Sequence, residues 1–321
     1  MSPTDPKAPR PGDRDEPVLV ELQGRTGNQL FGYALGVAIE SRTGRPVRYL
    51  ADHRDPSHYT LPQILTAPPR LASPDERRRA GIVDGRSLRA SLERRARRAR
   101  RRLPAPLAGT DAAWDEPGPF SFDERVFTLS PPRVLRGYFQ NERYFRDVAG
   151  PLAATIRLPS LELPDHIDAG LGRTAAVQFR RGDFVGLGWT LPLDFYDRAI
   201  DALLAEAELD ALVLIGDDRD FLTLAVERYR GRCPSVWSAY DAGDDPLGQL
   251  DLLSRCRHAV ISNSSYAWWG AWLGDQRIEG QRLVVAPDRW NEAGSPVVDR
   301  WVVVSAERGT TAGTRTTIGG R

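Results

Sequence analysis

The strongest constraint on the fold is the regular alternation of apolar runs and amphipathic segments in the C-terminal half of the chain. Apolar runs of strand length lie at 175–179, 211–215, 258–262 and 283–286. Segments with helical periodicity lie between or beside them, at 193–204, 221–229, 249–256 and 263–272. Strands that alternate with helices in this way predict a parallel sheet covered by helices, which is an α/β architecture.

The first of these strands ends in a group of polar residues, within the segment 176–183 (Ala-Val-Gln-Phe-Arg-Arg-Gly-Asp). In open α/β sheets, ligands bind at the carboxyl ends of strands. Arg180 and Arg181 would suit a diphosphate there, because guanidinium forks match phosphate oxygens and remain charged. Gly182 allows a close backbone approach, and Asp183 can orient an arginine or a sugar hydroxyl. The alternative is a structural Arg–Asp pair at a strand end.

A similar strand–loop–helix unit begins near residue 17. Residues 17–22 predict a strand, 24–29 (Gly-Arg-Thr-Gly-Asn-Gln) a tight loop, and 30–39 a helix. The loop would place backbone N–H groups and the Asn28 amide at a helix N-terminus, where anions or sugars bind. Its spacing matches neither GxGxxG nor a P-loop, so a plain strand-to-helix turn is the alternative.

Composition argues against several function classes. A net charge of +1 over 321 residues gives the whole chain no polyanion-binding signature, so no nucleic-acid partner is expected. Two cysteines without a CxxC pair predict reduced thiols. No apolar run is long enough to span a membrane, and residues 1–16 lack the apolar core of a signal peptide, so we expect a cytoplasmic protein. The histidines have neither zinc-site nor hydrolase-triad spacing; they are His53, His58, His166 and His258.

An arginine-rich segment interrupts the N-terminal half. Residues 77–102 contain twelve arginines and two acidic residues, a local charge of +10. Apolar residues in this segment share one helical face, which predicts an amphipathic helical insertion over 77–103. Such a helix can contact an anionic membrane, which would place the protein peripherally at the inner face of the membrane. The alternative is a solvated insertion helix.

Several motifs, taken together and in order, resemble bacterial α-1,2-fucosyltransferases of glycosyltransferase family 11, and more distantly α-1,6- and protein O-fucosyltransferases. The resemblance covers about residues 18–290. The motifs that carry it are Gly-Arg-Thr-Gly-Asn-Gln-Leu-Phe-Gly-Tyr-Ala at 24–34, Gly-Tyr-Phe-Gln at 137–140, Arg-Arg-Gly-Asp at 180–183 with Leu-Pro-Leu-Asp at 191–194, Gly-Asp-Asp at 216–218, Asn-Ser-Ser-Tyr-Ala-Trp-Trp-Gly-Ala-Trp at 263–272, and Ala-Pro-Asp-Arg-Trp at 286–290.

This resemblance implies a GT-B fold, in which two Rossmann-like domains face a cleft. The N-terminal acceptor domain would cover 17–160, with the arginine-rich insertion inside it. The C-terminal donor-nucleotide domain would cover 161–308. The remaining residues, 1–16 and 309–321, have the composition of disordered tails.

The resemblance also implies the reaction: transfer of L-fucose from GDP-fucose to a hydroxyl, usually the 2-OH of a galactoside, with inversion and with neither metal nor other cofactor. The partners would be the nucleotide-sugar donor and a galactoside or other glycan acceptor, including lipid-linked forms. By carry-over, Arg180 and Arg181 would hold the diphosphate, and Asp183 would support them or the fucose. The other implied donor contacts are Gly27, Asn28, Gln178, Asp217, Asp218, Gln249, Ser264 and Ser265.

Two positions depart from the family pattern beside the guanine base. Gln178 replaces a histidine, and Gln249 replaces an acidic residue whose carboxylate would accept from guanine N1–H and the 2-amino group. A glutamine offers one acceptor oxygen and adds two donors. Either Gln249 contacts guanine through that oxygen, or the donor carries another base, or the chain is a non-catalytic sugar- or nucleotide-binding relative.

Other carboxylates are open to more than one interpretation. Asp218 and Asp220 form a DxD pattern that can hold a divalent ion, but Asp218 also has the position of a helix N-cap. A carboxylate at the acceptor hydroxyl is expected of the reaction. The candidates for that general base are Asp183, Asp194, Glu142 and Asp217.

Overall fold

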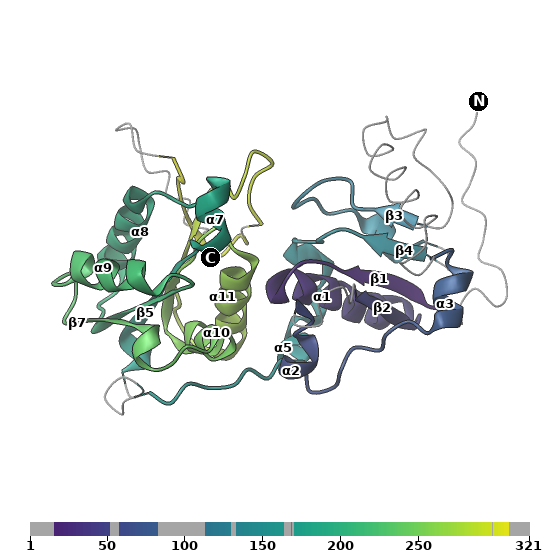
Figure 1. Cartoon of the computed structure of the whole chain (residues 1–321), viewed down its shortest axis with the longest axis horizontal. Coiled ribbons are helices and arrows are strands. Elements are labelled where there is room, and N and C mark those ends of the chain that lie inside the picture. Colours follow the sequence, from purple (N-terminus) through teal and green to yellow (C-terminus); the bar gives the residue numbers. More distant parts are fainter. Residues whose placement is uncertain are drawn as a thin grey trace. The chain divides into compact units, whose positions relative to one another are not determined.

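The computed structural model describes residues 16–51, 58–82, 113–129, 133–163, 168, 170–296 and 298–307. The tails and most of the arginine-rich insertion predicted above lie outside these ranges. The chain forms two compact units: one ends at Val148, and the other contains Gln63–Thr66 and the residues from Ala149 onward. The division precedes the predicted boundary at 160, because α5 (Ala149–Thr155) packs against α11 (Ser265–Arg277) (Figure 1).

The N-terminal unit contains a four-stranded parallel sheet with the order β2-β1-β4-β3. These strands are β1 (Val18–Leu22), β2 (Val47–Ala51), β3 (Ala113–Asp115) and β4 (Arg133–Arg136). The long helix α1 (Thr26–Thr43) follows β1 and packs against β1 and β2. It begins before residue 30, where the sequence predicted it, and ends at Gly44, whose φ of 68° is the left-handed conformation of a helix C-cap.

Short helical turns make up much of the rest of this unit. They include α3 (Pro74–Arg79), η3 (Glu124–Phe127), η4 (Glu142–Tyr144) and η5 (Arg146–Val148). The short helix α2 (Leu61–Ile64) begins in this unit, and its last two residues belong to the other. The segment 120–129 contains the 3-10 helix η3. The Asp123 side chain accepts a hydrogen bond from the Arg125 backbone N–H at 3.0 Å, and this local bond starts the turn.

The C-terminal unit contains a six-stranded parallel sheet with the order β10-β9-β8-β5-β6-β7. Its strands are β5 (Thr174–Phe179), β6 (Ala211–Gly216), β7 (Ser235–Ser238), β8 (His258–Val260), β9 (Val284–Pro287) and β10 (Val302–Val304). The chain starts at the centre with β5, adds β6 and β7 on one side, and then β8, β9 and β10 on the other. This is the doubly wound Rossmann order. The predicted α/β class with two Rossmann-like units is confirmed.

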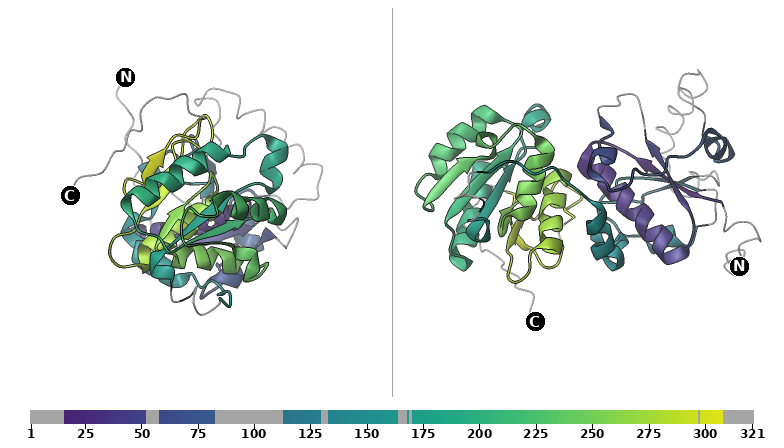
Figure 2. Two further views of the ribbon diagram at one scale, coloured as in Figure 1. Left: turned by 90° about the vertical axis from the view of Figure 1, so that its left-hand side faces the viewer. Right: turned by 90° about the horizontal axis from the view of Figure 1, so that it is seen from below.

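Helices cover this sheet (Figures 1 and 2). α8 (Leu193–Glu206) and α9 (Arg219–Tyr229) bury their apolar faces in one core with β5 and β6. α10 (Pro246–Arg255) packs against α11 and β5. In α11, Trp268, Trp269 and Trp272 are fully buried and contact one another edge to face or stacked, so they belong to the packing of this helix.

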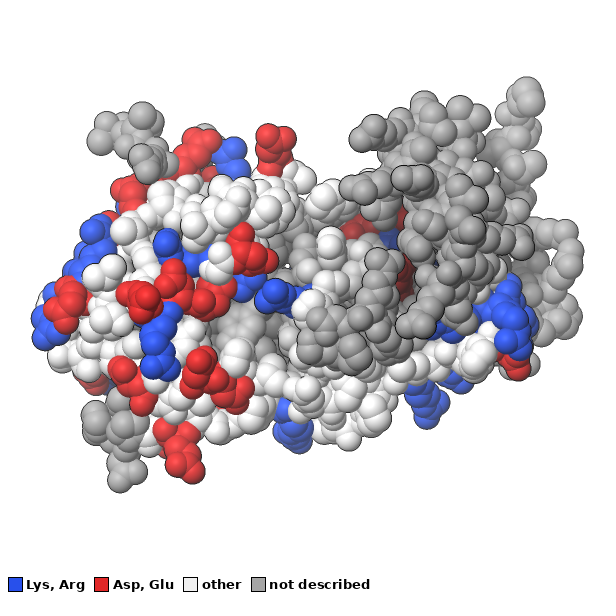
Figure 3. Space-filling model, viewed as in Figure 1, with Lys and Arg blue, Asp and Glu red and all other residues white. Residues whose placement is uncertain are grey.

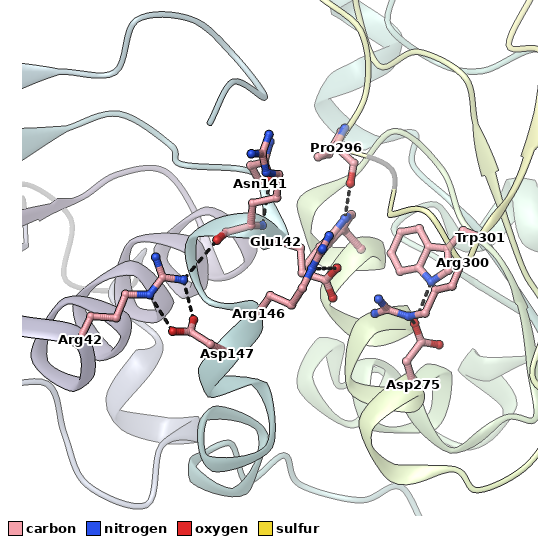
Figure 4. Close-up of polar contacts among 11 residues, drawn as sticks. Arg42, Asn141, Glu142, Arg146, Asp147, Asp275, Pro296, Arg300 and Trp301 are labelled. Atoms are coloured by element: carbon pink, nitrogen blue, oxygen red, sulfur yellow. Dashed lines mark hydrogen bonds and ion pairs between the residues drawn. The ribbon is translucent and has the colours of Figure 1, made fainter. Parts of the chain in front are cut away.

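Two ion pairs shown in Figure 4 differ in burial. In the C-terminal unit, the buried carboxylate of Asp275 accepts from Arg300 Nε at 2.6 Å and from Trp301 Nε1 at 2.8 Å, as Figure 4 shows. It also accepts from Arg282 Nη1 at 2.7 Å. In the N-terminal unit, Arg42 forms a two-point bond with Asp147, at 2.7 and 2.6 Å, near the surface. The first pair joins α11 to the chain on either side of β9, whereas the second joins the end of α1 to η5.

The described surface carries interspersed charges. On the face of the C-terminal unit in Figure 3, acidic and basic side chains lie among one another, in keeping with the small net charge of the chain. Among the described helices, none combines the length and the hydropathy required to cross a bilayer.

We expect Asp275→Ala to lower the free energy of unfolding by about 3–5 kcal/mol, because it leaves the buried Arg282 cation without a carboxylate. The matched variant Asp147→Ala should cost about 0–1 kcal/mol, because solvent screens an exposed pair. Urea denaturation of both variants measures the difference. Equal losses would contradict this ranking of the two pairs.

Candidate functional site

The predicted arginine pair lies at the topological switch point of the C-terminal sheet. Arg180 and Arg181 directly follow β5, and residues 261–264 follow the neighbouring strand β8. The chain leaves β5 toward β6 but later returns to the other side of β5 to form β8. Loops after such a pair of strands diverge and leave room for a ligand between them.

Carboxylates from two loops hold both guanidinium groups. Arg180 donates through Nη1 to Asp217 and through Nη2 to Asp183. Arg181 donates through Nε to Asp218 Oδ2 at 2.9 Å, and its backbone N–H donates to Asp217 Oδ1 at 2.8 Å. The Arg–Asp pairing that the sequence left as an alternative is therefore present, and it fixes the arginines at the strand ends.

Arg181 keeps hydrogen-bonding capacity beyond this pairing. Its guanidinium carbon lies 4.1 Å from the centre of the Phe221 ring, a cation–π distance, so the group is held flat. The described residues supply no acceptor for its two terminal nitrogens. Arg180 differs, because both of its terminal nitrogens already contact a carboxylate. Arg181 therefore has more hydrogen-bond donors available for a ligand than Arg180 has.

Asp218 is ionised and serves as a helix cap. Its side chain accepts from the Phe221 backbone N–H at 3.0 Å and caps α9. This bond, together with that from Arg181, holds the pKa of the Asp218 carboxyl below its usual value. The N-cap interpretation of the DxD pattern is thus confirmed.

Within the described ranges no group of His, Cys, Asp or Glu residues is arranged to hold a metal ion. The metal-independent reaction stays a prediction.

Gly182 allows the close approach of Asp217. A Cβ added at Gly182 would come within 2.6 Å of Asp217 Oδ2, closer than a methyl group tolerates. Gly182 begins the short helix α7 (Gly182–Leu187). The glycine leaves room for the Asp217 carboxylate in the position where it accepts from Arg180 and Arg181.

The loop after β8 is hydrogen-bonded to β5 and to the end of α7. Ser262 Oγ donates to Gln178 Oε1, and Gln178 Nε2 donates to the Phe179 carbonyl at 2.8 Å. Asn263 Nδ2 donates to the Trp189 carbonyl at 2.8 Å. Asn263 Oδ1 is buried and has no partner in the described part of the chain. Gln178 therefore orients this loop, and its contact with a base stays a prediction.

Helix α11 presents an uncapped N-terminus after the same loop. Ser264 is the N-cap residue, but its side chain makes no capping hydrogen bond. Ser265 begins the helix, which is thirteen residues long. The backbone N–H groups of a first turn and the positive end of the helix dipole together favour an anion. The structure thus puts Ser264 and Ser265 on the strand end next to that of the arginine pair.

Gln249 lies in the first half of α10 and is buried. Its Nε2 donates to the Gly243 carbonyl at 3.1 Å. Asp245 caps the helix by accepting from the Leu247 and Gly248 backbone N–H groups. This bond engages one of the two amide N–H groups of Gln249, and the contact of Gln249 with a base stays a prediction.

The remaining expected donor contacts, Gly27 and Asn28, belong to the N-terminal unit. Both lie in the first turn of α1. Asn28 Oδ1 accepts from Gln140 Nε2 at 2.8 Å. Gln140 lies in the 137–140 motif, to which the sequence alone assigned no residue role.

Each proposed general base has a cationic partner. Asp183 and Asp217 pair with Arg180, and Asp194 pairs with Arg198 at 3.0 Å. In the N-terminal unit, Glu142 pairs with Arg146 at 3.7 Å. The geometry does not single out one of them.

Sequence reasoning missed Glu116, which follows β3. Its Oε2 accepts from the Tyr138 and Phe139 backbone N–H groups at 2.8 and 3.1 Å, and desolvation raises its pKa. The sequence predicted no strand at 113–115 and offered no motif there, so nothing marked this carboxylate.

The model of glycosyl transferase family 11 matches residues 122–293, more than half of the chain. The chain belongs to this family. The match includes the arginine pair, the loop after β8 and the start of α11, but not the 24–34 motif. The predicted family and enzyme class, a glycosyltransferase, are confirmed.

Two named relatives come from Escherichia coli. The O-antigen biosynthesis glycosyltransferase WbnK is 27% identical over 40% of this chain and 44% of its own length. An alpha-1,2-colitosyltransferase is 27% identical over 52% of this chain and 60% of its own length. The chain spans about half the length of these relatives. The fucosyltransferase NodZ from Bradyrhizobium has a TM-score of 0.39 and 14% identity over 79% of this chain and 92% of its own, a likeness too weak to support an argument.

We expect Arg180→Lys to lower turnover by at least about tenfold, because an ammonium keeps the charge but cannot join Asp183 and Asp217 through a planar fork. Steady-state kinetics measure the loss, and a thermal melt checks folding. Arg228→Lys, which alters an ion pair with Asp197 on α8, is the matched control. Near-wild-type kinetics in Arg180→Lys would remove Arg180 from the mechanism.

Proposed function

We propose that the chain is an inverting, metal-independent glycosyltransferase that moves L-fucose from GDP-fucose to a glycan hydroxyl, the 2-OH of a galactoside in the first instance. The observation that carries the proposal is the arginine pair after β5 beside the uncapped N-terminus of α11. Membership of glycosyl transferase family 11 supports it. Because one relative is named a colitosyltransferase, the donor sugar itself needs a direct test.

The diphosphate is the group that this site suits best. In an inverting transfer, negative charge grows on the leaving diphosphate as the anomeric carbon becomes oxocarbenium-like. Fixed donors aimed at that charge stabilise the transition state more than the ground state. The terminal nitrogens of Arg181 and the first turn of α11 are such donors. Arg180 acts mainly by joining the two carboxylates that hold the loop in place.

The buried amide of Gln249 supports guanine as the base. The sequence raised the objection that a glutamine adds two donors where a carboxylate would accept. The Gly243 carbonyl accepts one of the two amide N–H groups, which orients the amide and leaves its oxygen available to accept from the base. Guanine presents two adjacent donors, N1–H and the 2-amino group, and both can share one acceptor oxygen. A uracil or thymine edge has one donor between two acceptors, so it forms fewer hydrogen bonds to the Gln249 oxygen than guanine does.

The unpartnered Asn263 oxygen supports a ligand rich in hydroxyl groups. A buried acceptor without a donor costs about 1–3 kcal/mol. A ribose or sugar hydroxyl that donates to Asn263 Oδ1 would recover that free energy on binding. The Asn263 nitrogen cannot rotate freely into this position, because it donates to Trp189.

We expect GDP to bind at least about tenfold more tightly than UDP or dTDP, which is a difference of about 1.4 kcal/mol. Titration calorimetry of the three nucleotides measures this. Gln249→Ala should weaken GDP and leave UDP nearly unchanged, while Gln63→Ala, at an exposed glutamine of α2, should change neither. Preference for UDP or dTDP would overturn the assigned base.

Turnover separates an enzyme from a binding protein. With GDP-fucose and a galactoside, the expected product is an α-linked fucoside, because inversion converts the β-linked donor, and EDTA should not reduce the rate. NMR of the product reads both the anomeric configuration and the acceptor position. Tight GDP binding without turnover on any galactoside would favour a non-catalytic sugar-nucleotide-binding relative.

A further inference from the structure

Two loops of the N-terminal unit meet at one hydrogen bond. Asn28 lies in the first turn of α1, after β1, and Gln140 lies in the loop after β4. β1 and β4 are neighbours in the parallel sheet, so their carboxyl ends lie at the same edge. Gln140 Nε2 donates to Asn28 Oδ1 at 2.8 Å. This bond joins two motifs that are more than a hundred residues apart in the chain.

The bond decides what Asn28 can offer to a ligand. A primary amide has one acceptor oxygen and one donor nitrogen. Since Asn28 Oδ1 accepts from Gln140, the nitrogen is the group left for a ligand, and no described residue accepts from it. Asn28 Nδ2 lies over Gly24, where an added Cβ would come within 2.5 Å. Gly24, with φ of 67°, permits the turn and leaves space for the nitrogen.

The structure holds Gln140 in place from behind. The preceding residue, Phe139, is fully buried with φ of 51°, a left-handed conformation that is uncommon outside glycine. Glu116 accepts from the Tyr138 and Phe139 backbone N–H groups. Gly137 passes so close to Glu116 that an added Cβ would lie 2.4 Å from the Glu116 Cβ. Gln140 itself is mostly buried, so it cannot easily follow a movement of Asn28.

The surroundings favour an oxygen acceptor in the ligand. α1 is eighteen residues long, and its N-cap residue, Arg25, makes no side-chain capping bond. The backbone N–H groups of this first turn add donors and positive potential beside Asn28.

We propose that Gln140 is a positioning residue: by donating to Asn28 Oδ1, it makes Asn28 a fixed hydrogen-bond donor toward an acceptor oxygen of a substrate. That oxygen belongs either to a phosphate of the sugar nucleotide or to a hydroxyl of the glycan. This assignment rests on the proposed glycosyltransferase function and adds a residue that orients one of its substrate contacts.

Gln140→Glu tests the direction of the bond. An ionised glutamate only accepts, so it would draw Asn28 Nδ2 toward itself and turn Asn28 Oδ1 toward the substrate oxygen. We expect kcat/KM to fall by at least about tenfold at roughly pH 8, where the new carboxyl is ionised. At roughly pH 5 a larger fraction of this partly buried carboxyl is protonated and can donate, so activity relative to wild type should recover. A purely structural defect gives no such recovery.

Three comparison variants test whether the effect depends on the hydrogen bond between Gln140 and Asn28. Gln140→Met keeps the size but removes the donor, and it should lose activity without the pH-dependent recovery. Gln63→Glu, at an exposed glutamine in α2, should behave as wild type. Gln140→Glu in an Asn28→Ala background should add no further pH-dependent loss. A rise confined to the KM of the sugar nucleotide assigns the acceptor oxygen to phosphate, whereas a rise confined to the KM of the glycan assigns it to a hydroxyl.

A measurement that does not depend on turnover can test the positioning role of Gln140 separately from the proposed function. The ¹⁵N-labelled side-chain amide signal of Asn28, identified by its loss in Asn28→Ala, should shift in Gln140→Met and titrate with pH in Gln140→Glu. An Asn28 signal indifferent to both variants, or wild-type kcat/KM in Gln140→Glu at both pH values, overturns the positioning role. If the signal responds as expected but the wild-type protein turns over no sugar nucleotide, the orientation stands and the proposed function fails.

Discussion

The pairing of two guanidinium groups with three carboxylates at the ends of β5 and β6 is the interaction on which the C-terminal site depends. It holds Arg180 and Arg181 in fixed positions before any ligand arrives. The cluster carries one more negative than positive charge, so the arginines alone cannot neutralise a diphosphate there. The additional positive potential comes from the first turn of α11, on the next strand end. The site is therefore a mixed one, in which ordered cations and backbone N–H groups act together.

Fixed arginines reduce the cost of binding. A free arginine side chain loses rotamer freedom when it contacts a ligand, and this loss subtracts from affinity. Here Asp218 and the Phe221 ring have already ordered Arg181, so its terminal nitrogens need no further restriction. Asp218 also caps α9, which links the orientation of Arg181 to the stability of that helix.

The sequence predicted the C-terminal sheet well where strands are buried on both faces. β5 and β6 read as continuous apolar runs because helices cover both sides of them. β7 and β10 were missed because these edge strands are short, and their alternation is obscured by serines or by a run of valines.

The same limit applies to the site. Motif spacing found Arg180, Arg181, Asp217 and Asp218, but it could not tell that these carboxylates bind the arginines themselves. Glu116 and the Gln140–Asn28 bond depend on how separate loops meet at a sheet edge. Such contacts are tertiary, and a single sequence contains no local signal for them.

The near-contact between Gly182 and Asp217 has a consequence for how relatives of this chain can diverge. A Cβ at position 182 would lie 2.6 Å from Asp217 Oδ2, so a larger residue there would displace the carboxylate whose other oxygen accepts from the Arg181 backbone. A relative with a larger residue at position 182 needs a shorter or displaced side chain at position 217. The two positions should therefore change together across related sequences. Paired replacement of this kind would identify the relatives in which a group other than Asp217 holds Arg180.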